Sequence, residues 1–187
     1  MNTPDIILEV QTLGRFSVSV NGEAVAAEWP DEELKVFFCS LLSPLDLYFN
    51  WDRICRSMLG VPATRSSRRQ LEQILIRPLN VFLIKELGFN PLLCGPEGIR
   101  IDPQHIHVDA HEFYCNVLEG LRLLSIASNT EAVEKFSRAN SLYAGSYLPG
   151  MPGKIIESTR HDLEVLYRST VVEGAWHNRT ALQTRKS

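Results

Sequence analysis

The chain has 187 residues, of which 44% are hydrophobic and 22% are charged, so one domain or two small domains can bury a core. Its net charge of −3 excludes a protein that is basic throughout, and any affinity for polyanions must come from a local cluster of positive charge. The first ten residues lack a basic region and a long apolar run, and no stretch reaches membrane-spanning length, so we expect a cytoplasmic protein without membrane contact.

The first elements expected are strands. Residues 8–20 alternate between apolar and polar side chains, with an interruption at Gly14, which is the period of a half-buried strand. Asn21-Gly22 follows directly and is the strongest short hairpin signal, so residues 24–27 can pair back on the preceding strand. The pattern predicts a small antiparallel sheet.

Three helices are expected next. Pro30 and the acidic residues after it suit the first turn of a helix over residues 31–43, and Pro44 ends that helix. Asn50 is a good N-cap for a short second helix over residues 51–59. A third helix begins near residues 64–67. Its inward side is expected to hold five apolar side chains: Leu71, Ile74, Leu75, Leu79 and Phe82.

A second hairpin follows the helices. Residues 92–94 and 99–101 flank the turn sequence Gly95-Pro96-Glu97-Gly98, which predicts two short strands around a tight turn. A sheet, three helices and a hairpin, in that order, predict a winged helix-turn-helix domain over residues 1–107, with the hairpin as its wing.

From Val108 onward the periodicity is only helical. Residues 109–124, 128–143 and 155–176 each predict a helix, and Ser128 and Glu131 have the spacing of a capping box. The first of these helices is expected to bury one side: Phe113, Val117, Leu118, Leu121 and Leu124. The predicted fold class is therefore α+β, a winged helix-turn-helix with small antiparallel sheets followed by an all-α, tetratricopeptide-like domain over residues 108–187. Because no Gly/Ser-rich spacer separates them, we expect a packed interface.

Positive charge is concentrated in residues 51–100, which hold eight basic and four acidic side chains, a net charge of +4. The first fifty residues hold two basic and eight acidic side chains, a net charge of −6. A basic helical segment inside an acidic chain is a candidate nucleic-acid face, although an ordinary solvated helix surface produces the same pattern.

The third helix carries the side chains suited to reading bases. With Leu71, Ile74 and Leu75 turned inward, a helical wheel places four base-reading candidates on the outer face: Ser66, Arg69, Gln73 and Arg77. Arginine reads guanine with two hydrogen bonds, and glutamine reads adenine. Five further arginines are candidates for phosphate contacts: Arg53, Arg56, Arg65, Arg68 and Arg100.

Several stretches resemble the SARP family of bacterial transcriptional activators. Three of them carry most of the likeness, in the family's order: Leu13-Gly14-Arg15-Phe16-x-Val18-x-Val20-Asn21-Gly22, Ile106-His107-Val108-Asp109-x-x-x-Phe113, and Ala139-x-x-Leu142-Tyr143-x-Gly145-x-Tyr147-Leu148-Pro149-Gly150. The resemblance implies an OmpR-type winged helix that binds DNA. It also implies a following bacterial transcriptional activator domain, whose helices support or dimerise the winged helix.

Two departures from the family pattern affect these expectations. Pro78 lies inside the expected recognition helix, and an interior proline costs about 3 kcal/mol unless a kink is accommodated. The helix is therefore expected to bend or end near Ile76. Only 79 residues follow Val108, and the family's helical domain is longer, so this domain is expected to be a shortened version.

A shortened helical domain would leave an apolar face on its last helix for a second subunit. The residues of that predicted partner face are Val165, Leu166, Val172 and Trp176. A homodimer would suit two DNA half-sites one helical turn apart. The alternative is a monomer with a partly exposed apolar patch.

The sequence contains no recognisable catalytic or cofactor motif, so we expect no enzyme activity and no cofactor. His105, His107 and His111 form a string that zinc could accept, but no cysteine lies at zinc-finger spacing, so no metal site is expected. The four cysteines are expected to be small buried hydrophobic residues: Cys39, Cys55, Cys94 and Cys115.

The predicted function is that of a sequence-specific transcriptional regulator, with the third helix in the major groove and the wing on the backbone. Its expected partners are double-stranded DNA, RNA polymerase and a second copy of the chain. The alternative is a winged-helix and helical-repeat module that binds a protein and no DNA. Pro78 and the acidic first fifty residues favour this alternative, whereas the clustered arginines favour DNA.

Overall fold

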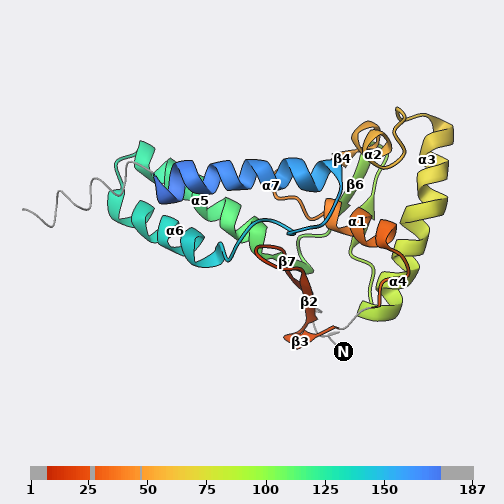
Figure 1. Ribbon diagram of the computed structural model, residues 1–187, viewed down its shortest axis with the longest axis horizontal. Coiled ribbons are helices and arrows are strands. Elements are labelled where there is room, and N and C mark those ends of the chain that lie inside the picture. Colours follow the sequence, from red (N-terminus) through yellow and green to blue (C-terminus); the bar gives the residue numbers. More distant parts are fainter. Residues whose placement is uncertain (1–7, 26–27, 47, 174–187) are drawn as a thin grey trace, which may run out of the picture.

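The computed structural model describes residues 8–25, 28–46 and 48–173. Its elements, in chain order, are β1 (Leu8–Gln11), β2 (Ser17–Val20), β3 (Glu23–Ala24), α1 (Glu32–Ser40), β4 (Phe49–Asn50), α2 (Trp51–Met58), α3 (Arg65–Leu71), η1 (Glu72–Ile76), α4 (Arg77–Leu87), β5 (Leu92–Cys94), β6 (Gly98–Ile101), β7 (Ile106–Val108), α5 (Asp109–Ser125), α6 (Asn129–Leu142), α7 (Lys154–Leu166) and η2 (Tyr167–Val172). Figure 1 shows α1–α4 with β4 and β6 toward one end, the long helices α5, α6 and α7 toward the other, and the strands β2, β3 and β7 between them. The predicted α+β class, a winged helix followed by helices, is confirmed. Within the described residues, no helix combines the length and apolarity needed to cross a membrane.

The N-terminal sheet has the strand order β3-β2-β1-β7. Strands β1 and β2 pair antiparallel, as predicted, and β3 pairs back on β2. Asn21 and Gly22 have φ angles of 51° and 84°, which a two-residue turn of this type requires. The place of the fourth strand in this sheet was not predicted. It pairs parallel with β1 and leads directly into α5, so this sheet joins the N-terminal strands to the start of the helical part.

Three helices and a three-stranded sheet of order β4-β6-β5 form the winged helix. The carboxylate of Asp31 caps α1 by accepting a hydrogen bond from the Leu34 amide at 2.7 Å, so Pro30 precedes the helix and does not enter its first turn. Asn50 caps α2, as predicted. Strands β5 and β6 form the predicted wing, and the short β4 before α2 pairs with β6.

The third helix continues past Pro78, so the predicted end near Ile76 is wrong, whereas the helix is distorted at the predicted place. Helix α3 runs into the π-helical turn η1, in which the Arg77 amide donates to the Glu72 carbonyl five residues back, and then into α4. Pro78 falls in the first turn of α4, where a missing N–H costs least. The wider turn also rotates the helix faces. Ile74 is 44% exposed and Ile76 is buried, so the predicted inward position of Ile74 is wrong.

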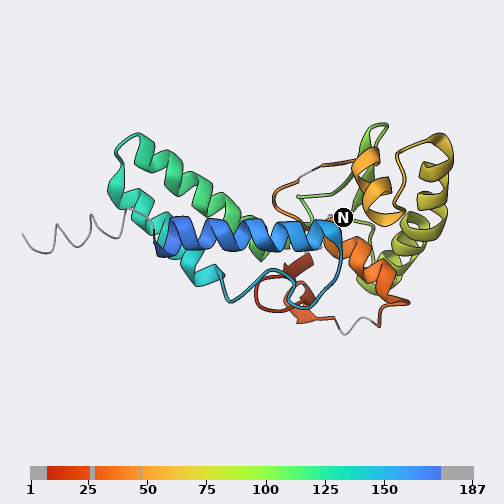
Figure 2. The ribbon, with the colours of Figure 1, turned by 45° about the horizontal axis from the view of Figure 1, so that its top comes forward.

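Helices α5 and α6 pack along each other, and α7 starts beside α1 and extends back along them (Figures 1 and 2). Gly120 allows the close approach of α5 to α6, because a Cβ there would lie 2.8 Å from the buried Phe136 ring. The inward stripe of α5 is narrower than predicted: Leu118 and Leu121 are exposed. The predicted capping box is also wrong, since Ser128 bonds the side chain of Glu131 and caps no backbone amide.

One hydrophobic core joins these elements. Its largest fully buried side chains come from both ends of the molecule: Tyr147, Phe37, Phe38, Phe49, Phe113 and Phe136. Cys39 and Cys55 are buried, as predicted, whereas Cys94 on the wing and Cys115 on α5 are exposed, because both lie on the solvent side of their elements. All four cysteines are free thiols.

The winged helix and the helical part meet at a hydrogen-bonded joint. The carboxylate of Asp109, the first residue of α5, accepts hydrogen bonds from the Thr12 amide, the Thr12 hydroxyl and the Leu13 amide. The buried hydroxyls of Ser43 and Thr159 lie 2.8 Å apart and connect the end of α1 to α7. The predicted division between residues 107 and 108 therefore falls inside this joint, and it stays a prediction.

Candidate nucleic-acid interface

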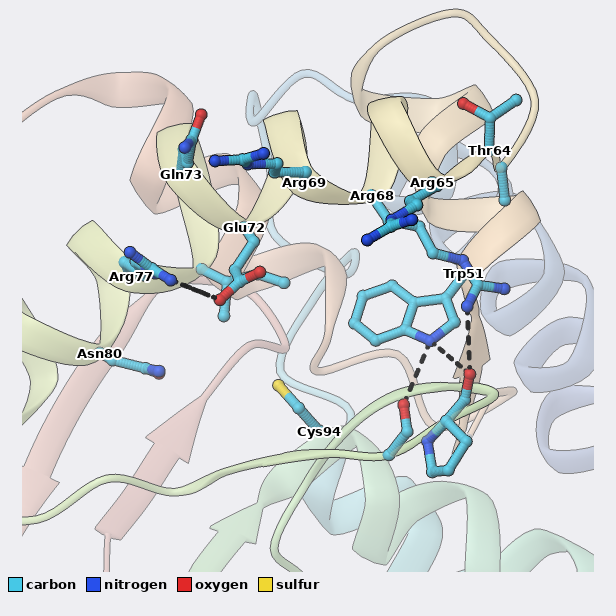
Figure 3. A pocket seen from close by; sticks show the side chains of 14 residues that line it. Trp51, Thr64, Arg65, Arg68, Arg69, Glu72, Gln73, Arg77, Asn80 and Cys94 are labelled. Carbon is cyan, nitrogen blue, oxygen red and sulfur yellow. Dashed lines mark hydrogen bonds and ion pairs between the residues drawn. The ribbon is translucent and has the colours of Figure 1, made fainter.

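An open groove of about 970 Å³ lies between the third helix and the wing (Figure 3). We call it the helix–wing groove, and its lining residues are Trp51, Ala63, Thr64, Arg65, Arg68, Arg69, Glu72, Gln73, Ile76, Arg77, Asn80, Cys94, Gly95 and Pro96. Four arginines and one glutamate give this lining a net charge of +3, in a chain whose net charge is −3. The groove is therefore a local positive site on an acidic protein.

Three groove side chains form an open row on the helix: Arg65, Arg69 and Gln73 (Figure 3). Four-residue spacing places them on one face, and Thr64 fixes the start of that face by capping α3. All three are exposed, and within the described part of the chain none makes a side-chain hydrogen bond or ion pair. Their donors and acceptors are therefore available to a ligand.

Arg68 is engaged with the wing. Its guanidinium lies 5.6 Å from the centre of the Trp51 ring and donates to the Pro96 carbonyl at 3.2 Å. The Trp51 indole N–H donates to the Gly95 and Pro96 carbonyls at 3.2 and 3.0 Å. Figure 3 shows these contacts meeting at the turn of the wing. Arg68 and Trp51 thereby fasten the wing to the helices, a role that the sequence did not predict.

Arg77 is held by an acidic neighbour in the same groove. Its Nη2 and Nε donate to Glu72 Oε1 at 3.0 and 3.2 Å, across the π-helical turn. Both side chains are largely exposed, so the pair itself adds little stability. Its effect is to fix the direction of the Arg77 guanidinium.

Four predicted DNA-contacting residues lie outside the groove lining: Ser66, Arg53, Arg56 and Arg100. Ser66 is exposed on another side of α3. Arg53 pairs with Asp46, and Arg56 pairs within α2 with Asp52 at 2.6 Å. Arg100 lines a separate cavity of about 130 Å³ at the base of the wing, together with Asp46. These four residues belong to the same basic segment as the groove residues, but their side chains do not line the groove.

Nine of the fourteen lining residues were not among the predicted contact residues, and they include Trp51, Thr64, Glu72, Asn80 and Cys94. The N-cap preference of threonine could have indicated Thr64. Asn80 joins the groove because the helix continues past Pro78. Its side-chain oxygen is buried and has no hydrogen-bond partner in the described part of the chain. Trp51 and Cys94 reach the groove only through tertiary packing, and no local pattern marks them.

The predicted partner face on the last helix is divided in the structure. Val165 and Val172 are about half exposed, whereas Leu166 packs against the core. Val171, next to this face, is buried. Trp176 lies outside the described residues. Two exposed valines therefore remain of the predicted face.

The histidine string is spread over separate contacts. His105 Nδ1 lies 3.0 Å from Asp102, whose pKa is lowered first by a backbone hydrogen bond from Gln104 and then by this histidine. His111 Nε2 lies 3.1 Å from the Leu42 carbonyl, and burial lowers the pKa of its ring. Among the described residues, no group of three or more His, Cys, Asp or Glu side chains could hold a metal ion.

No protein-family model matches the chain, and no curated protein matches it. A solved structure does: Mycobacterium tuberculosis EmbR in complex with a low affinity phosphopeptide matches with a TM-score of 0.61 and 15% sequence identity. The match covers 86% of this chain and 42% of the EmbR chain, so this chain spans less than half the length of that protein. The likeness shows that the two chains share a fold over the matched residues.

Proposed function

We propose that this protein is a sequence-specific, DNA-binding transcriptional regulator. Its third helix enters the major groove, and its wing lies against the DNA backbone. The observation that carries the proposal is the open row of Arg65, Arg69 and Gln73 in a groove of net charge +3. The structural likeness to EmbR supports the fold-level part of the proposal.

The chemistry of the row suits duplex DNA better than a protein partner. An α-helix fits the major groove, where arginine bonds guanine O6 and N7 and glutamine bonds adenine N6 and N7. Arg69 and Gln73 follow each other at one helical turn and are the base-reading pair of this proposal. In this proposal Arg65, at the start of α3, contacts a phosphate. The groove binds in this proposal and catalyses no reaction.

Binding should be tested by selection from random duplex DNA, followed by titration of the selected site at two salt concentrations. The logarithm of the binding constant should fall with the logarithm of salt by about 0.9 for each phosphate contacted. Arg69→Ala and Gln73→Ala should each cost about 1–3 kcal/mol at the selected site and relax its sequence preference. Arg65→Ala should weaken all duplexes alike and lower the slope by about one.

Arg122→Ala is the matched control. Arg122 is an exposed arginine on α5, far in sequence from the groove, so the variant loses the same charge and should keep wild-type binding. The proposal fails if selection enriches no site and the wild type binds no better at low salt than an Arg65/Arg69 double variant. The interaction-module interpretation would then replace it.

Two further partners belong to the proposal: RNA polymerase and a second copy of the chain. The exposed Val165 and Val172 are the described residues on which a homodimer would rest. Light scattering should then give a dimer mass at micromolar concentration, and Val172→Asp should give the monomer. A monomer mass for the wild type would remove the dimer and leave the DNA proposal intact.

A further inference from the structure

The Glu72–Arg77 pair exists because the helix widens between the two residues. In an α-helix, residues five apart point about 140° away from each other around the axis, so their side chains do not meet. Here the Arg77 amide bonds the Glu72 carbonyl, and the π-helical turn brings the two positions toward the same side. The carboxylate then accepts from Arg77 Nη2 at 3.0 Å and Nε at 3.2 Å.

Pro78 accounts for the position of this turn. A proline at that place has no N–H to donate to the carbonyl of Ile74, and its ring would collide with that carbonyl in a regular helix. Widening of the preceding turn removes the conflict and lets α4 begin at Arg77. Such single π-helical turns occur often at functional sites. Pro78 is therefore linked, through the π-helical turn, to the position of Arg77 in the groove.

The pairing leaves the reading edge of Arg77 open. A guanidinium has five N–H groups, and Glu72 takes one on Nε and one on Nη2. The two N–H groups on Nη1 and the second N–H group on Nη2 remain, and they form the pair of donors that bonds guanine O6 and N7. The side chain is 68% exposed in the paired state and lines the groove (Figure 3). The guanidinium is thus held at its inner edge and accessible at its outer edge.

We infer that Glu72 is a positioning residue that sets Arg77 to read a guanine, so that the DNA site of this protein carries a G·C pair opposite Arg77. The inference rests on the proposed function. Its physical basis is preorganisation: a long side chain that is already ordered loses less freedom on binding. Because the carboxylate itself repels phosphate, its contribution is to discrimination between bases and not to general affinity for DNA.

Two other roles for Glu72 make different predictions. As an ordinary surface ion pair, it would have no effect on base preference. As a direct reader, its carboxylate would accept a hydrogen bond from cytosine N4, and Glu72→Ala would then lower discrimination even where Arg77 is already replaced. Substitution of Glu72 and Arg77 on the same DNA panel separates the three roles.

The experiment uses the full chain, the selected duplex, and a panel of duplexes in which each position is changed to the other three base pairs. Arg77→Ala should abolish discrimination at one G·C pair. Glu72→Ala should reduce discrimination at that same pair about two- to tenfold, while binding to unrelated duplex stays equal or increases. Glu72→Gln should retain part of the discrimination, because its amide oxygen still accepts from Arg77. The double variant should be no less selective than Arg77→Ala.

Glu119→Ala is the matched control, since Glu119 pairs with the exposed Arg122 on α5, and it should leave the whole panel unchanged. The inference is overturned if Glu72→Ala discriminates between bases as well as the wild type does. It is also overturned if Glu72→Ala loses discrimination at a base pair other than the one affected by Arg77→Ala. In both cases the wild type still binds its site, and the proposed function stands. If the wild type selects no site, the proposed function fails and this inference fails with it.

Discussion

Asp109 offers the sharpest test of how the winged helix is held to the helical part. Its Oδ1 accepts from the Thr12 amide at 2.7 Å and from the Thr12 hydroxyl at 2.6 Å, and its Oδ2 accepts from the Leu13 amide at 3.0 Å. Thr12 and Leu13 are fully buried. Asp109→Ala therefore removes every acceptor that the structure gives to two buried amides and one hydroxyl of the winged helix, and it also removes the acceptor of the Ala110 amide within α5.

The magnitude follows from those three donors. Each buried donor without a partner costs about 1–3 kcal/mol. The hydroxyl can rotate and water can enter the vacated space, so the total should be nearer the lower limits, about 3 kcal/mol. That loss is large against the 5–15 kcal/mol of a typical folded protein. At about 2–4 °C for each kcal/mol in a chain of this size, Tm should fall by about 6–12 °C.

Denaturant unfolding followed by both circular dichroism and tryptophan fluorescence measures the effect, because two of the three tryptophans, Trp29 and Trp51, belong to the winged helix, whereas the longest helices, α5, α6 and α7, belong to the rest. Asp109→Asn should lose less than Asp109→Ala, since its side-chain oxygen can keep the Thr12 bonds. Asp162→Ala is the control: its carboxylate receives only a 3.5 Å bond from Ser158, so the change should stay within about 0.5 kcal/mol. A loss in Asp109→Ala no larger than in this control would refute the reasoning.

Three further predictions concern other contacts. Arg68→Ala should change the fluorescence of Trp51 and speed amide exchange in the wing turn, because its guanidinium lies over that ring and bonds the turn; an unchanged spectrum and exchange would show that the wing holds without it. Burial lowers the pKa of His111 in the folded protein, so its stabilising contribution is complete above the unfolded value of about 6.5 and is lost as pH falls through the folded pKa. The free energy of unfolding should change by at most about 1.4 kcal/mol per pH unit in this range. Between pH 5 and 7, the free energy of unfolding of His111→Gln should therefore depend less on pH than that of the wild type. Gly120→Ala should destabilise the protein by about 1 kcal/mol in thermal unfolding. The clash of the added Cβ with the Phe136 ring costs about 1–3 kcal/mol, which exceeds the helix-propensity gain of about 1 kcal/mol. A higher Tm would show that α5 and α6 shift to make room.

Local sequence signals were sufficient where the physical cause is also local. The alternation of residues 8–20 and the Asn21-Gly22 turn predicted β1 and β2, because side-chain period and positive φ are properties of a few neighbouring residues. Asn50 predicted the start of α2 for the same reason. The concentration of arginines between residues 51 and 100 likewise indicated which segment would carry the groove, since charge content needs no coordinates.

The candidate site was harder to predict from the sequence, because a helical wheel assumes a constant number of residues per turn. The π-helical turn breaks that period after Leu71, so Ile74 turns outward and Ile76 inward. It also pairs Glu72 with Arg77, a contact that five-residue spacing would not suggest. Proline in the sequence indicated a disturbance, but whether the helix ends, kinks or widens depends on what packs around it.

What the sequence by itself determined is most of the helices and strands and the place of the positive charge. What only the tertiary structure decided is which side chains those elements bring together. Strand β7 pairs with β1 almost a hundred residues away, and Asp109 then meets Thr12. Arg68 is drawn onto Trp51 and the wing turn, while Arg100 points to a different cavity. These contacts join residues that are distant in the chain, and the directions of their side chains depend on packing that no local period encodes.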